Sequence, residues 1–224
     1  MIRDEPVEVP QAAPARPGGI RLTERHWCQL CAHLLRDGHE HAALLICGVQ
    51  AHSGGGVEFL VRSVIELTDE DYLEAGELHL SISPRSLARY AKHARSEGAT
   101  LVLCHSHPFP GEVFASPVDL RTEIELCGRV FPSRLNGIPC AALILGPDGL
   151  DGRVWDGGAS PLTQVTVIGS RIERRFSNAC GLPNQRRAQT RNLPRNTGCT
   201  PPTAVVARTS FSGSNILQGS LRAV

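Results

Sequence analysis

An α/β fold, with a mixed β-sheet flanked by helices, is the architecture that this 224-residue chain predicts. Three observations predict it: short apolar runs of strand character, helix-start signals between them, and a strand–helix–strand order in the centre of the chain. The composition, with 41% hydrophobic and 20% charged residues, is ordinary for a globular protein. We therefore expect one full domain with tails.

The helix and strand signals follow one another along the central region. A helix is expected at about 22–36, and strands at 41–49 and 57–67 are joined as a hairpin by three glycines. Ser83 and Pro84 begin a helix that leads directly into an apolar strand at 101–104, which makes a β-α-β crossover. The remaining expected elements are a helix from 119 to about 129, strands at 140–145 and 162–168, and a short strand at 153–155 between them.

Charge divides the chain into unequal parts. Residues 1–169 hold 14 Lys and Arg against 21 Asp and Glu, whereas 170–224 hold nine Arg against Glu173 alone. The second part is rich in Pro, Ser, Thr and Asn and has few regularly spaced apolar residues. We expect a Pro-rich disordered leader at 1–19, a folded domain at 20–169 and a basic, disordered tail at 170–224. A nucleic-acid role is not expected, because the tail lacks interleaved aromatics or a binding motif.

Nothing in the sequence predicts a membrane segment or a signal peptide. No apolar run reaches about eighteen residues, and the first residues are charged and then rich in proline. We therefore expect a cytoplasmic protein. The eight cysteines mostly lie inside apolar runs, which favours buried reduced thiols over a disulfide framework.

Three metal-ligand side chains follow the strand at 101–104. His105 and His107 are two residues apart, so both imidazoles lie on one face of an extended chain. Pro108 ends the strand, and the loop after it lets the chain fold back and deliver Asp119. Two nitrogens and one oxygen leave the fourth tetrahedral position of one Zn²⁺ open, as catalytic zinc sites do.

The segment that carries Asp119 also has a second interpretation. Ser116 as N-cap, Pro117 at the first helical position and Asp119 as the acidic partner of a capping box predict a helix start. The two interpretations need not compete, because a cap residue can hold a ligand in place.

Other zinc patterns fit less well. His39 and His41 could bind a metal by themselves, although exposure at the start of the strand is the favoured interpretation. Cys28, Cys31 and His33 look like half of a structural zinc site, but the second cluster is missing and the spacing fits the apolar face of a helix. The H-x-E with P-C-x-x-C pattern of zinc deaminases and the H-E-x-x-H pattern of zincins are both absent.

The H-S-H-P sequence at 105–108, followed by S-P-V-D at 116–119, resembles the signature of the JAB/MPN (JAMM) metalloprotease family. Active members carry an upstream Glu, then H-[ST]-H-P and S-x-x-D. The resemblance implies one zinc ion bound by His105, His107 and Asp119. It also implies that Ser116 helps stabilise the tetrahedral intermediate and that Glu40 activates the zinc-bound water.

Glu40 precedes an apolar run that ends in Gly48, and this run is similar to the opening strand of the family. It is most similar to the bacterial JAB domains that accompany ubiquitin-activating-like adenylyltransferases. The resemblance covers about 20–169 and implies the three-layer architecture shared with cytidine deaminases. One departure is that eight residues separate His107 from Ser116, one more than the commoner spacing, so this loop should bulge.

The expected activity is that of a zinc metallopeptidase or isopeptidase, deubiquitinase-like, acting at the C-terminus of a ubiquitin-like protein or its conjugate. An adenylyltransferase is a candidate partner. Zinc lowers the pKa of bound water to about 7, Glu40 would accept its proton, and the Ser116 hydroxyl would donate to the developing oxyanion. The alternative is a non-catalytic scaffold or binding module of a ubiquitin-like conjugation or defence complex, which need hold no zinc.

Overall fold

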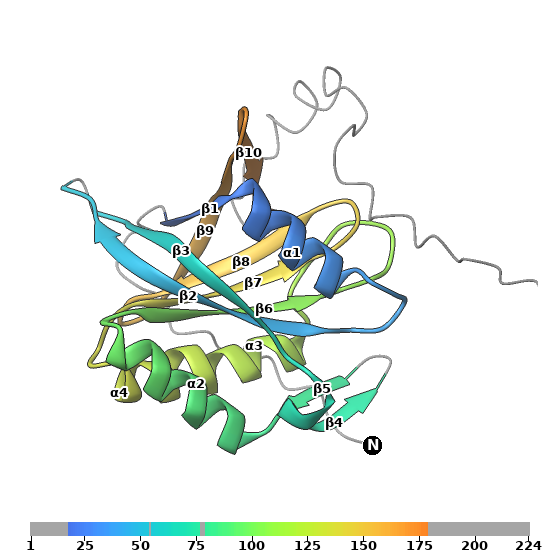
Figure 1. Ribbon diagram of the computed structural model, residues 1–224, viewed down its shortest axis with the longest axis horizontal. Helices are drawn as coiled ribbons and strands as arrows, with labels where there is room; N and C mark the ends of the chain where they lie inside the picture. The colour runs from blue at the N-terminus through green and yellow to red at the C-terminus, as the bar shows by residue number, and fades with distance from the viewer. Residues whose placement is uncertain (1–17, 54, 77–78, 179–224) are drawn as a thin grey trace, which may run out of the picture. The chain divides into compact units, whose positions relative to one another are not determined.

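The computed structural model describes residues 18–53, 55–76 and 79–178 (Figure 1). Its strands are β1 (Gly18–Thr23), β2 (Ala42–Ala51), β3 (Val57–Glu66), β4 (Tyr72–Gly76), β5 (His79–Ile82), β6 (Thr100–Ser106), β7 (Cys140–Leu145), β8 (Leu150–Trp155), β9 (Ala159–Ile168) and β10 (Ile172–Phe176). Its helices are α1 (Glu24–Leu34), α2 (Pro84–Ser96), α3 (Pro117–Glu125) and α4 (Phe131–Arg134), with a 3-10 turn η1 (Asp69–Asp71) and a π-helical turn η2 (Leu126–Val130) between α3 and α4.

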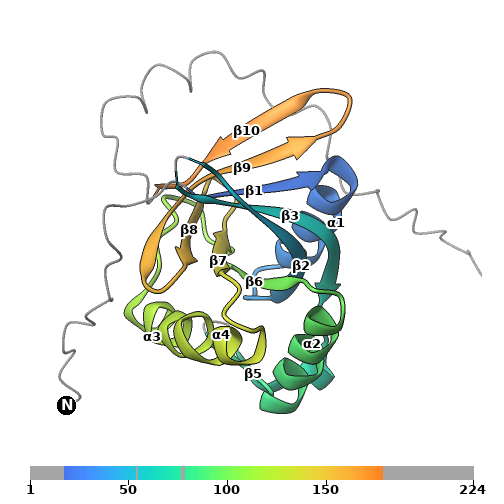
Figure 2. The same cartoon turned by 90° about the vertical axis from the view of Figure 1, so that its left-hand side faces the viewer.

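The main sheet closes on itself. Its strands follow the order β1-β3-β2-β6-β7-β8-β9-β10, and β1 also pairs with β9, so the first seven strands form a closed barrel. β1 runs parallel to both of its neighbours, and β6 runs parallel to β7. The other pairs in this sheet are antiparallel. β10 stays outside the ring, paired with β9 (Figure 2), and β4 and β5 form a separate hairpin.

The predicted three-layer α/β architecture, an open mixed sheet flanked by helices, is therefore wrong. The sheet closes because residues 18–23 form β1, whereas the sequence placed them in the leader and at the start of a helix. Ile20 lies opposite Phe59 on β3 and opposite Val165 on β9. β1 thus joins two strand edges that an open sheet would leave apart.

Alternate residues of β2 lie in two different hydrophobic cores, as the two-residue period of a strand requires. Leu45 belongs to the core that fills the barrel and reaches Trp27 and Leu30 of α1. Leu44 belongs to the core outside the barrel, together with Phe131 of α4. Figure 1 shows α1 on one side of this part of the sheet and α2, α3 and α4 on the other. The strands at the candidate site are thus buried on both faces.

Several local elements agree with the sequence. The antiparallel β2–β3 hairpin and the crossover from β3 through α2 to β6 are confirmed. The expected tail began at residue 170, but β10 continues the sheet, and the structure describes the chain to Asn178. The leader at 1–17 and the tail from 179 onward lie outside the described residues. None of the helices within the described ranges has the length and apolar character needed to cross a membrane.

The cysteines agree with the sequence in part. Free thiols are found at Cys31, Cys47, Cys104, Cys127 and Cys140, and all of these but Cys31 are buried. Cys28 is disulfide-bonded, which differs from the expected reduced state.

Closure of the barrel by β1 can be tested with Ile20→Ala. Ile20 is fully buried, so truncating its side chain should lower the free energy of unfolding by about 2–5 kcal/mol. Urea unfolding measures this change. Leu73, which is 65% exposed, provides the control, and Leu73→Ala should change the free energy by less than about 0.5 kcal/mol. Equally small effects of the two variants would contradict the closed barrel.

Candidate metal centre

Two neighbouring strands bring Glu40 next to His107. β2 and β6 are antiparallel, with Ala42 opposite His105. Because the two strands run in opposite directions, the residue two positions before Ala42 lies opposite the residue two positions after His105. Glu40 therefore lies opposite His107. The Glu40 Oε1 atom lies 4.0 Å from His107 Nε2. The register of these two strands thus sets the position of the predicted general base.

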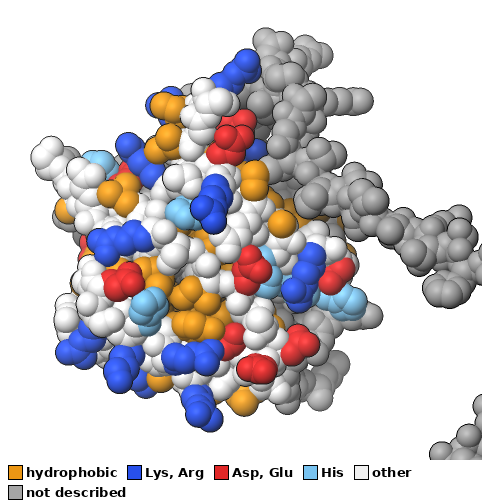
Figure 3. Space-filling view, in the orientation of Figure 1, with side chains coloured by type: hydrophobic (Ala, Val, Ile, Leu, Met, Phe, Trp, Pro, Cys, Tyr) orange, Lys and Arg blue, Asp and Glu red, His pale blue; other side chains and the backbone are white. Residues whose placement is uncertain are grey.

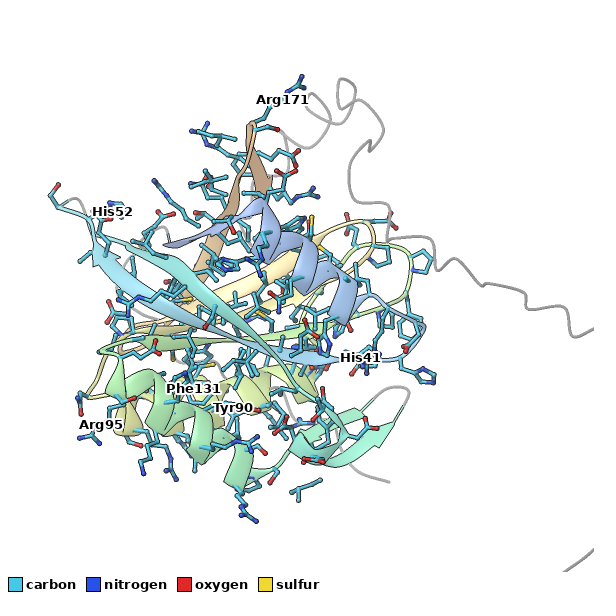
Figure 4. The ribbon with its side chains drawn as sticks, in the orientation of Figure 1. His41, His52, Tyr90, Arg95, Phe131 and Arg171 are labelled. Carbon is cyan, nitrogen blue, oxygen red and sulfur yellow. The ribbon has the colours of Figure 1, made fainter. Side chains whose placement is uncertain are left out.

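Ser106, between the two histidines, fastens this end of the strand pair. Its buried hydroxyl accepts a hydrogen bond from the His41 N–H at 2.9 Å, and its own N–H donates to the His41 carbonyl at 3.0 Å. Figure 4 shows His41 at the start of β2. Because His41 directly follows Glu40, these two bonds also hold the backbone that carries Glu40.

Asp119 reaches the histidines from the first turn of α3. The Ser116 Oγ accepts from the Asp119 N–H at 3.2 Å, and the Ser116 N–H donates to Asp119 Oδ2 at 2.7 Å, which completes a capping box. Asp119 Oδ1 lies 3.3 Å from His105 Nε2, and Oδ2 lies 3.3 Å from His107 Nε2. The same carboxylate thus caps the helix and faces both imidazoles.

The spacing of these three side chains fits one zinc ion. Their ligand atoms all lie within 4.8 Å of one another, and this is the one such group found among the described residues. Tetrahedral zinc with bonds of about 2.0–2.1 Å places neighbouring ligand atoms about 3.3–3.4 Å apart. Asp119 presents a different oxygen to each imidazole at 3.3 Å, Oδ1 to His105 Nε2 and Oδ2 to His107 Nε2.

A second observation points to a metal at the same place. His105 Nε2 is buried and has no hydrogen-bond partner, although it is 3.3 Å from Asp119. The contact with Asp119 lacks hydrogen-bond geometry, so this buried nitrogen is only partly satisfied by it. A metal ion bound between the three side chains would satisfy it.

The site is electrostatically polarised. The hydrogen bond that His107 donates to the Asp119 carboxylate raises the pKa of His107, and the negative charges of Glu40 and Asp151 add to this effect against the opposing effect of burial. Burial alone would raise the pKa of Asp119, but the two imidazoles and the Ser116 N–H hold that pKa well below its usual range. Asp119 is therefore an ionised carboxylate, and a metal that bound here would have to displace the proton that its charge helps His107 to hold.

A buried ion network fixes α3 against β8. Arg153 donates to both oxygens of Glu123 at 2.6 Å and to Asp151 Oδ2 at 2.9 Å, and both carboxylates are buried. Glu123 lies one helical turn after Asp119, on the same side of α3. Asp151 Oδ2 also accepts from the N–H of Ala115, just before the helix N-cap, at 3.1 Å. Arg153 thus fastens the chain on both sides of the turn that carries Asp119.

Further contacts fasten the loop between the histidines and α3. The Gly111 N–H donates to Asp148 Oδ2 at 3.0 Å, and the Val113 carbonyl accepts from Asn178 Nδ2 at 3.0 Å. Val113 is buried. The loop between His107 and Ser116 is therefore held to the body of the protein.

The other metal-ligand candidates have structural partners. His41 is buried, and its Nε2 lies 2.8 Å from Asp37 Oδ1. His33 Nε2 forms a 2.9 Å hydrogen bond with the Ala42 carbonyl. Neither of these residues, nor His39, belongs to a three-ligand group within the part of the chain that the structure describes.

Sequence reasoning identified Glu40, Ser116 and the three candidate metal ligands but missed the supporting network. Glu123, Asp151 and Arg153 were not identified as site residues. Two signals were present in the sequence. One is an Asp and an Arg two positions apart in an otherwise buried strand, and the other is a carboxylate one turn after Asp119.

Comparisons with known proteins assign no family. No family model matches the chain, and no curated protein matches it. Among solved structures, it is similar to the solution structure of protein DSY2949 from Desulfitobacterium hafniense, with 20% sequence identity and a TM-score of 0.43. This match covers 66% of the chain and 92% of DSY2949.

The role of Ser106 in holding the two strands can be tested with Ser106→Ala. The variant leaves the His41 N–H without the side-chain acceptor it has now, so the free energy of unfolding should fall by about 1–3 kcal/mol. Thermal unfolding measures the change. Ser96→Ala, which removes an exposed hydroxyl that bonds to the His93 carbonyl, should change the free energy by less than about 0.5 kcal/mol. A Ser106→Ala protein as stable as this control would contradict the role.

The role of the ion network can be tested with two substitutions of Arg153. Arg153→Met leaves the buried Glu123 and Asp151 without their cation, which should lower the free energy of unfolding by about 3–5 kcal/mol. Arg153→Lys should lose less, because its ammonium keeps the charge but cannot form the two-pronged contact. Urea unfolding at neutral pH compares the variants. Wild-type stability in both would show that the network does not hold α3.

Proposed function

We propose that this chain is a zinc-dependent metallopeptidase or isopeptidase that hydrolyses an amide bond. The observation that supports this proposal is the convergence of His105, His107 and Asp119 with a fourth side chain, Glu40, beside them. Two imidazoles and one carboxylate leave a coordination position open, as in catalytic zinc sites and unlike the closed sets of structural sites.

The residues of the site have distinct tasks in such a hydrolysis. When bound, zinc supplies a Lewis acid that polarises the scissile carbonyl and lowers the pKa of water. Glu40, whose side chain is 13% exposed, accepts the proton of the attacking water and returns it to the leaving amine. The Ser116 Oγ already accepts from the Asp119 N–H, so its own proton is directed elsewhere and can be donated to the developing oxyanion.

The resemblance to JAB/MPN proteases extends the proposal to the substrate. The proposed substrate is the C-terminal tail of a ubiquitin-like protein or its conjugate, and an adenylyltransferase is the proposed partner. Three exposed apolar residues lie within two positions of site residues in the sequence: Phe109, Phe114 and Val118. They offer apolar contacts to the residues that flank the bond to be cleaved.

The general-base role is tested by Glu40→Gln. This variant should bind zinc like the wild type, because Glu40 is outside the ligand set, but its kcat/KM should fall by about 10²–10⁴-fold. The assay incubates zinc-loaded protein with ubiquitin-like fusions encoded near its gene and detects a product shortened after Gly-Gly. Asp119→Ala should lose zinc together with activity, and Glu97→Gln, on the exposed end of α2, should change neither.

Three outcomes would contradict the proposal in different ways. Full activity of Glu40→Gln removes Glu40 from the mechanism. A wild-type protein that retains zinc but cleaves none of the fusions favours the scaffold hypothesis. A wild-type protein that binds no zinc overturns the metal centre itself.

A further inference from the structure

β10 is an exposed strand edge. Within the described residues it pairs with β9 alone, whereas the other strands of the main sheet form the closed ring. All of its residues are exposed, including Ile172 at 66% and Phe176 at 55%. Figure 2 shows the β9–β10 hairpin projecting from the barrel with β10 outermost. Such an edge is a template on which another strand can pair.

The hydrogen-bonding pattern shows which backbone groups face that edge. The Ser177 N–H donates to the Thr163 carbonyl, and the Gly169 N–H donates to the Arg171 carbonyl. Arg171 and Ser177, which flank β10, are thus both hydrogen-bonded to the β9 side, and both have odd numbers. Because hydrogen-bonded and non-hydrogen-bonded residues alternate along an antiparallel pair, the odd-numbered residues of β10 bond to β9. The even-numbered residues of β10 therefore direct their N–H and C=O groups away from β9: Ile172, Arg174 and Phe176.

The β10 sequence, Ile-Glu-Arg-Arg-Phe, is complementary to itself when read in the opposite direction. In an antiparallel pair centred on Arg174, Ile172 lies opposite Phe176 of the second copy, and Glu173 lies opposite Arg175. This register uses all of the outward-facing backbone groups. It also places Glu173 and Arg175 in the non-hydrogen-bonded pairs, where side chains come closest.

We propose that β10 pairs antiparallel with β10 of a second copy of this chain, forming a dimer with two-fold symmetry. Aromatic–β-branched pairs and opposite-charge pairs both stabilise such a ladder. Arg175 Nη2 already lies 3.2 Å from Glu173 Oε2 within one strand, so the two copies would join these ion pairs into a ring of four alternating charges. Figure 3 shows acidic, basic and hydrophobic side chains gathered on this projecting part.

Arg174 weakens the proposed dimer. At the centre of the register it meets its own copy, and like charges directly opposite one another are destabilising. The paired segment is also short, so the dimer should be weak and depend on protein concentration. Arg171, at the tip of the hairpin, lies far from His41 at the start of β2 in Figure 4. Dimerisation therefore leaves the candidate metal centre accessible and does not depend on its function.

The first experiment is sedimentation velocity of the full chain over about a hundredfold range of concentration, with two variants of one residue. The wild type should change from monomer to dimer. Arg174→Pro removes an N–H that points away from β9, so it should abolish the dimer without lowering the thermal unfolding temperature. Arg174→Thr removes the like-charge pair and keeps the N–H, so it should lower the dimer dissociation constant several-fold.

A charge exchange tests the register. Glu173→Arg alone should abolish the dimer, and adding Arg175→Glu should restore it, because the opposite-charge pair is then re-formed in reverse. Arg175 stacks on the Trp27 ring at 4.8 Å, so circular dichroism must first show that the double variant is folded.

Two results would overturn the proposal. If the wild type and Arg174→Thr both remain monomeric over the whole range, the charges of β10 serve to prevent pairing, as on many natural strand edges. If Arg174→Pro dimerises as tightly as the wild type, the two copies associate through another surface.

Discussion

The antiparallel register between β2 and β6 is the constraint on which the candidate site depends. A slip of one residue would turn every side chain of β2 to the opposite face. Leu44 and Leu45 would then exchange the outer and inner cores in which each is now buried. The two hydrophobic cores thus fix the register, and the register places Glu40 opposite His107. The burial of Leu44 and Leu45 thus helps to determine how far the Glu40 carboxyl lies from the His107 imidazole.

The second constraint is the position of α3, which carries Asp119. Attaching a helix through a largely buried arginine and two buried carboxylates is costly in free energy, because all three charges lose most of their contact with water. In return, the guanidinium of Arg153 fixes the geometry, because it donates two hydrogen bonds to the Glu123 carboxylate. A metal ligand must be held to within a fraction of an ångström, and supporting residues of this kind provide that precision. This positioning role would explain why Glu123, Asp151 and Arg153 are charged at positions where apolar side chains would pack more simply.

Sequence patterns predicted what is local and missed what is remote. The histidine pair and the capping box of Ser116 and Asp119 lie within a few residues, so strand and helix periodicity alone predicted their arrangement. The barrel closure was missed because residues 18–23 hold only two large apolar side chains and become a strand through distant partners. β10 was missed because its charged sequence carries no buried alternation. The partners of Arg153 are likewise brought together only by the fold.

The most direct test of the metal centre is anomalous diffraction at the zinc edge from crystals of the full chain grown with zinc. The proposed metal centre requires one strong peak about 2.0–2.2 Å from a ring nitrogen of His105, a ring nitrogen of His107 and an oxygen of Asp119, with Glu40 close by but not bound to the metal. A peak at other residues, or no peak between these three side chains at full zinc loading, would contradict it.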